Sequence, residues 1–90
     1  SLMAARKQEV ELLKELDPEE VLSALGIEYK KMNGYLLMHS PVREGDEHPS
    51  FTVFYGTNTG YWIYKDHATG WKGSSIDLWK AVRGVDYITA

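Results

Sequence analysis

The sequence predicts an α+β fold, in which a four-stranded antiparallel sheet is flanked by N-terminal helices and a C-terminal helix. The first observation is a change of period, because apolar residues recur with helical spacing before Ile27 and alternate after it. The second is the position of turn-forming residues, since Asn33-Gly34 and a Gly-bounded stretch at 56–60 interrupt the alternating part. Together these observations indicate two hairpins that follow the helices.

Two helices are expected at the N-terminal end. Residues 4–16 alternate apolar and charged side chains in the manner of an amphipathic helix. A second helix follows Asp17, a capping residue, with Pro18 at its first position, and Gly26 ends it. The apolar positions of the two helices are Val10, Leu12, Leu13, Leu16, Val21, Leu22 and Leu25.

Four short strands form the predicted sheet. They cover residues 28–32, 35–39, 51–55 and 61–65. A polar loop at 40–50 separates the two hairpins, and a second loop at 66–73 leads to the last helix. That helix is expected to begin at Ser74 and to end at Gly84.

The chain is expected to hold one small domain and a helix that precedes it. Residues 1–16 form the helix, with Ser1 and Leu2 interpreted as a cloning remnant, and residues 17–90 form the domain. The pattern at 85–90 is that of a helix just starting, which indicates a fragment of a longer protein. No stretch approaches the ~18 apolar residues of a membrane span, so a cytoplasmic protein without a membrane partner is expected.

Composition limits how this domain is stabilised. The absence of cysteine excludes disulfides and thiolate metal sites, so the three Trp and six Tyr are expected to supply apolar burial. The net charge of −3 is carried by residues 1–27, whereas residues 28–90 hold seven basic and seven acidic side chains. The second part of the chain is therefore compatible with a local basic surface.

Two segments of the chain resemble a known family. Residues 49–53, Pro-Ser-Phe-Thr-Val, and residues 70–78, Gly-Trp-Lys-Gly-Ser-Ser-Ile-Asp-Leu, are similar in order and spacing to the zinc ribbon of bacterial-type DNA primases. The helix that ends at Gly26 and the residues 29–35 also resemble the approach to that ribbon's first ligand pair. The resemblance covers about residues 17–90 and implies a zinc-ribbon-like fold.

The resemblance places Ser40, Arg43, Asp66 and Thr69 at the four zinc-ligand positions. Zinc in such ribbons requires thiolate and imidazole donors, so the chain resembles a degenerate member that has no metal cofactor. We expect Arg43 and Asp66 to pair across the two loops, with Ser40 and Thr69 as neutral hydrogen-bond partners. The alternative interpretation is that the two charges are exposed and unrelated.

A relocated metal site is a further alternative. His39, His48 and His67 lie in or beside the same loops, and Asp66 is near them in the sequence. Their spacing matches no zinc pattern, so we favour a fold without metal.

The resemblance implies a function in DNA replication. In the family, this domain binds single-stranded template DNA beside a separate catalytic domain, so a downstream primase or helicase domain is an expected partner. The chain has no paired carboxylates, nucleophile–base set or phosphate-binding glycine loop, and is not expected to be an enzyme by itself. Binding of single strands needs aromatic rings and cations. The expected contacts are Trp62, Tyr64, Lys65, Trp71 and Lys72.

Two alternatives remain open for this function. The aromatic side chains, Trp62 and Trp71 among them, are also suited to filling the core of a small domain without metal. The domain as a whole is equally compatible with a protein-interaction or structural module in a phage or mobile-element replication protein. In that case the acidic amphipathic helix at 4–16 would dock a partner or an adjacent domain.

Overall fold

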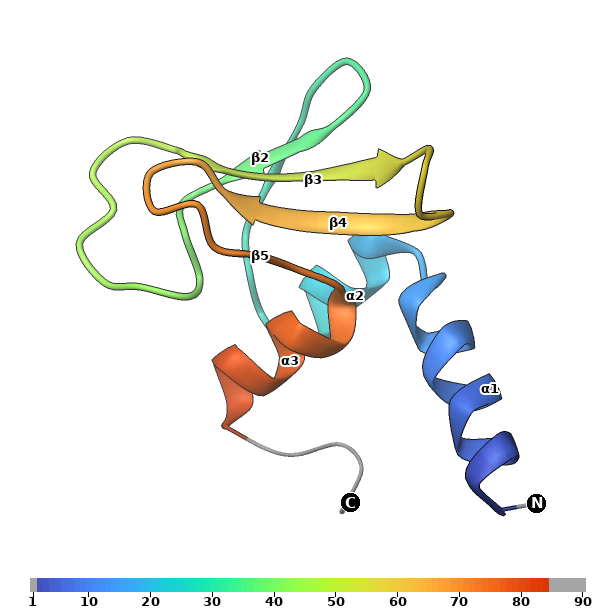
Figure 1. The fold of residues 1–90 in the computed structure, drawn as a ribbon. Coiled ribbons are helices and arrows are strands. Elements are labelled where there is room, and N and C mark those ends of the chain that lie inside the picture. Colours follow the sequence, from blue (N-terminus) through green and yellow to red (C-terminus); the bar gives the residue numbers. More distant parts are fainter. Residues whose placement is uncertain (1, 85–90) are drawn as a thin grey trace.

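The computed structural model describes residues 2–84 and shows an α+β fold of three helices and a five-stranded antiparallel sheet. The strands are ordered in the sheet as in the chain. The three helices all lie on one side of the sheet (Figure 1). In chain order the elements are α1 (Leu2–Lys14), α2 (Pro18–Ala24), β1 (Lys30–Lys31), β2 (Leu36–Met38), β3 (Phe51–Gly56), β4 (Tyr61–Asp66), β5 (Lys72–Gly73) and α3 (Ser75–Arg83).

The α+β class is confirmed, but the predicted number of strands is wrong. A fifth strand, β5, pairs with the inner strand β4 through Tyr64↔Gly73 and Lys65↔Lys72. Two residues are too short a stretch for apolar alternation to signal, so the sequence placed them in a loop. A Cβ atom at Gly73 would stand 2.6 Å from the Cβ of Asp77, so only glycine lets α3 begin this close to the sheet.

The predicted helix ends are confirmed where local capping determines them. Asp17 Oδ1 accepts a hydrogen bond from the backbone N–H of Glu19 at 3.0 Å, and Pro18 is the first residue of α2. Ser74 and Asp77 form a capping box at the start of α3, and Gly84 ends that helix in the left-handed region at φ 66°. The helix expected from residue 85 onward lies outside the described residues.

The core lies between the helices and the side of the sheet that they cover. Fully buried side chains from β3 and β4 meet fully buried side chains from α2 and α3. Burial of each large apolar side chain stabilises the fold by about 1.5–3 kcal/mol. These residues are Phe51, Val53, Tyr64, Leu22 and Leu78. Among residues 2–84, no helix has the length and apolar character needed to cross a membrane.

Candidate functional site

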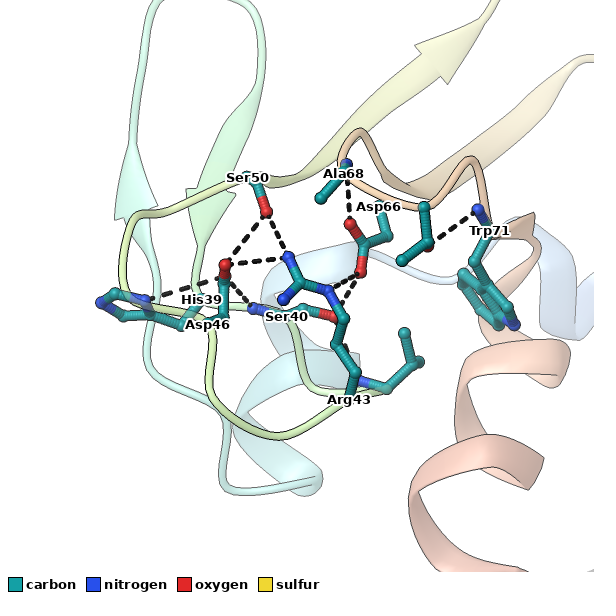
Figure 2. Close-up of polar contacts among 10 residues, drawn as sticks. His39, Ser40, Arg43, Asp46, Ser50, Asp66, Ala68 and Trp71 are labelled. Atoms are coloured by element: carbon teal, nitrogen blue, oxygen red, sulfur yellow. Dashed lines mark hydrogen bonds and ion pairs between the residues drawn. The ribbon is translucent and has the colours of Figure 1, made fainter.

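The polar loop at 40–50 is joined to the end of β4 by an ion pair whose carboxylate is buried. Arg43 Nε donates to Asp66 Oδ2 at 2.8 Å, and Ser40 Oγ donates to the same oxygen at 2.8 Å (Figure 2). The other carboxylate oxygen of Asp66 accepts from the backbone N–H of Ala68 at 2.9 Å, and the Asp66 side chain is fully buried. The predicted pair of Arg43 with Asp66, assisted by Ser40, is confirmed.

A second carboxylate, that of Asp46, completes the network and was not predicted. Its Oδ1 accepts from Arg43 Nη2 at 2.9 Å and from Ser50 Oγ at 3.2 Å, and its Oδ2 accepts from the backbone N–H of Ser40 at 2.7 Å. Arg43 therefore lies between two carboxylates, as Figure 2 shows. The pattern in the sequence that could have indicated this contact is the spacing of Arg43 and Asp46, which stand three residues apart in one short loop. We call Ser40, Arg43, Asp46, Ser50 and Asp66 the loop network.

The loop network favours the ionised form of both carboxyl groups. Burial raises the pKa of Asp66, but hydrogen bonds from Arg43, Ser40 and the Ala68 backbone outweigh this effect and lower the pKa to about 2. Burial also raises the pKa of Asp46, and the donors around it again produce a net decrease. The hydrogen bond to Asp66 is the main cause that raises the pKa of Arg43.

The residues at the four positions that the resemblance assigns to zinc do not fit that metal. Thr69 is exposed, and its hydroxyl accepts from the backbone N–H of Trp71 at 3.3 Å, so the prediction that it joins the ion pair is wrong. The other three positions supply a hydroxyl, a guanidinium and one carboxylate, whereas zinc ribbons use thiolates and imidazoles. The guanidinium already places a positive charge 2.8 Å from the only carboxylate of the set, that of Asp66.

The three histidines do not gather into an alternative metal site in the part of the chain that the structure describes. No group of three or more His, Asp or Glu side chains there is arranged to hold a metal ion. His39 Nδ1 lies 3.7 Å from Asp46 Oδ2 beside the loop network. His67 Nε2 instead lies 2.7 Å from the hydroxyl of Thr52, on the sheet.

The aromatic side chains predicted to contact DNA lie on the side of the sheet that faces the helices. Tyr64 is fully buried, and its hydroxyl has no hydrogen-bond partner among the described residues. Burial raises the pKa of this hydroxyl. Because Tyr64 pairs with Val53 across the β3–β4 ladder, both side chains enter the core. The assignment of Tyr64 to a DNA-binding surface is therefore corrected.

The two tryptophans of the predicted DNA-binding surface also pack against other side chains. The centroids of the Trp71 and Phe51 rings are 5.9 Å apart, and those of the Trp62 and Tyr55 rings, which meet in a T-shaped arrangement, are 5.4 Å apart. Both tryptophans are half-buried and pack against the core. These contacts fit a role of the two tryptophans in the core better than a role as exposed rings on which DNA bases stack.

The two predicted lysines lie on the opposite side of the sheet, in one row that crosses all five strands. The register aligns Lys30 with Leu37, Leu37 with Thr52, Thr52 with Lys65, and Lys65 with Lys72. Directly paired residues of antiparallel strands point to the same side, so three lysines share this surface. Phe54 and Ile63 form a neighbouring pair on the same side.

An open groove runs beside this row, and sequence reasoning missed it. It is lined by Gly34, Tyr35, Leu37, Thr52, Phe54 and His67. We define the outer face as this groove together with Lys30, Ile63, Lys65 and Lys72. The helices are on the other side of the sheet (Figure 1).

Comparisons of the chain with protein-family models, with curated proteins and with solved structures found no match.

Proposed function

We propose that this chain is the single-stranded DNA-binding module of a primase-like replication protein, and that it binds DNA through the outer face. The observation that carries the proposal is the row of Lys30, Lys65 and Lys72 beside a groove with aromatic walls. Cations that follow the phosphates and rings that stack on bases are the two requirements of single-strand binding.

The arrangement of the lysines favours an anionic ligand. Lys65 and Lys72 are direct neighbours across the β4–β5 ladder, and like charges in that position destabilise a sheet. A phosphate bound between them would remove this repulsion. No ion pair within residues 2–84 joins Lys30, Lys65 or Lys72 to an acidic side chain, so all three charges remain available.

The groove supplies the second requirement. Two aromatic residues line it, Tyr35, which is 37% exposed, and Phe54, which is half-buried. A single strand can present the faces of its bases to such rings, whereas a duplex has already stacked them. The Thr52 hydroxyl and the His67 imidazole add hydrogen-bonding atoms at the same place.

The proposal includes a zinc-ribbon-like fold in which the loop network takes the place of the metal. Arg43 and Asp66 join the two loops that a zinc ion would join in the family that the sequence resembles. The role is one of binding, as the non-catalytic part of a primase, and the catalytic chemistry would belong to another domain.

Titration of a fluorescently labelled oligonucleotide tests this proposal. Lys65→Ala combined with Lys72→Ala should weaken binding at least roughly tenfold at low salt. The slope of log K against log salt should become shallower by about 1.4, because each phosphate contact with a single strand contributes about 0.7. Lys80→Ala, which removes an exposed lysine on α3, is the matched control and should change neither value. Absence of binding by the unaltered chain at low salt, or equal binding by the double variant, would refute the proposal.

A further inference from the structure

The turn between β1 and β2 holds an exposed Asn-Gly pair. Asn33 and Gly34 are both exposed, and Figure 1 shows the loop that leads into β2 projecting beyond the rest of the sheet. The backbone N–H of Met32 donates to the carbonyl oxygen of Tyr35 at 2.9 Å and so closes the turn. Gly34 has φ 90°, a conformation that residues with a side chain rarely adopt. The pair therefore suits the turn, and it also brings a reactivity of its own.

Neither reactive group of this pair has a hydrogen-bond partner within residues 2–84. The side-chain amide of Asn33 makes no hydrogen bond there, and the backbone N–H of Gly34 makes none either. A Cβ atom at Gly34 would have nothing within 4 Å, so the space around this residue is open. The Gly34 nitrogen is thus free to approach the side chain that precedes it.

These conditions suit an attack within the chain on the Asn33 side chain. The Gly34 nitrogen forms a bond to Asn33 Cγ, the bond from Cγ to Nδ2 breaks, and ammonia leaves with the proton of the Gly34 N–H. The product is a cyclic imide, which water opens at either carbonyl carbon. Opening at Cγ leaves an aspartate at position 33. Opening at the backbone carbonyl carbon leaves an isoaspartate, in which the main chain passes through the former side chain and is one methylene group longer.

The chain's other asparagine is less suited to the same reaction. Asn58 is also exposed in a turn, but the residue after it is Thr59, whose branched side chain crowds the backbone nitrogen. The Thr59 N–H also donates to the carbonyl oxygen of Gly56 at 3.2 Å, so its nitrogen is already engaged. Asn58 therefore serves as an internal control for Asn33.

We propose that Asn33 is a site of spontaneous deamidation through Gly34, and that the carboxylate formed there weakens binding of single-stranded DNA by the outer face. Gly34 and Tyr35, the next two residues, line the groove of that face. Either product adds a negative charge beside a surface that offers lysines to phosphates, and like charges across an interface oppose binding. Isoaspartate also displaces Tyr35, because it lengthens the main chain just before it. The first part of the proposal is independent of DNA, whereas the second rests on the proposed function.

Peptide mass spectrometry of the whole chain, incubated at mildly alkaline pH, tests the first part. The peptide that contains Asn33 should gain the mass difference between a hydroxyl and an amino group. It should also separate into aspartate and isoaspartate forms, while the peptide that contains Asn58 stays unchanged. Asn33→Gln keeps a neutral amide but moves its carbon away from the attacking nitrogen, so this variant should remain intact. An unchanged Asn33, or an equal rate at Asn58, would overturn the proposal.

Asn33→Asp tests the second part, because it adds the charge without altering the main chain. In the oligonucleotide titration at about 0.1 M salt, this variant should bind at least roughly threefold more weakly. Asn58→Asp is the matched control, since its turn begins at Gly56, which is about 13 Å along β3 from Thr52 in the row of lysines. At this salt concentration charges more than about 10 Å apart are largely screened, so the control should bind as the unaltered chain does.

The outcomes separate this proposal from the proposed function. If the unaltered chain binds DNA and Asn33→Asp binds equally well, the second part is wrong while the proposed function holds. If the unaltered chain binds no DNA, the proposed function fails and the second part fails with it, and mass spectrometry still decides the first part. Incubation should lower the affinity of the unaltered chain in step with deamidation, and Asn33→Gln should keep its affinity under the same conditions.

Discussion

The loop network and the outer face use their charged side chains in opposite ways. In the loop network, Arg43 is surrounded by Asp46 and Asp66, and every charge has a partner within 3 Å. On the outer face, Lys65 and Lys72 stand side by side without an acidic partner among residues 2–84. Charges of the first kind hold two loops together, whereas charges of the second kind cost stability and are available to a ligand. The difference separates residues that maintain the fold from residues that are candidates for binding.

The largest effect is expected from breaking the loop network at its buried carboxylate. Asp66→Asn keeps the shape of the side chain but removes the negative charge that pairs with Arg43. It also replaces one carboxylate oxygen with an NH2 group, which then faces the hydrogen-bond donors around it. Loss of the charge of a fully buried, hydrogen-bonded carboxylate is destabilising, so Tm should fall by roughly 10 °C. Thermal unfolding followed by circular dichroism measures this change. Glu47→Gln, an exposed substitution in the loop at 40–50, should leave Tm nearly unchanged.

A double-variant cycle shows whether the stability lost in Asp66→Asn comes from the contact between Arg43 and Asp66. Arg43→Met and Asp66→Asn should be non-additive in the free energy of unfolding, because each removes the same contact. The double variant should therefore be more stable than the sum of the two losses predicts. Additive losses would mean that the two residues act separately and that the loop network does not join the loops.

A smaller effect, confined to binding, is expected on the outer face. Tyr35→Ala should weaken binding of single-stranded DNA by about fivefold or more, because loss of one stacked base costs about 1–3 kcal/mol. The Tm of this variant should hardly change, since Tyr35 does not belong to the buried core. Tyr55→Ala is the matched control, because Tyr55 is 50% exposed but lies on the other side of the sheet, against Trp62. Equal losses in the two variants would place the DNA elsewhere than on the outer face.

The sequence was informative where structure depends on local chemistry. Asp17, Pro18 and Gly84 determine helix ends through interactions with their own neighbours, and these ends were predicted correctly. The pairing of Arg43 with Asp66 was predictable for another reason, since the resemblance had already aligned the two loops that carry them. The contribution of Asp46 depends on how the loop at 40–50 folds back, which no periodic pattern describes.

The side of the sheet that the helices cover was not predictable in the same way. Strand alternation puts Trp62 and Tyr64 on one side of β4 and Lys65 on the other. It does not show which side the helices cover, because that depends on packing between elements far apart in the chain. The structure buries Tyr64 and leaves Lys65 on the outer face, so the predicted site divides between two surfaces.

The smallest effect is expected from acid pH, and it acts on the loop network through Asp66. The pKa of Asp66 is about 2 in the folded chain against an ordinary value of 3.8, so folding favours its ionised form. The stability that this shift provides is complete above about pH 4 and is lost as the pH falls from about 4 to about 2. Urea unfolding across this range should show a decline that Asp66→Asn reduces, because the variant has no carboxyl group to protonate there. An equally steep decline in the variant would assign the acid sensitivity to other carboxylates, with Asp46 the first candidate because its pKa is also lowered.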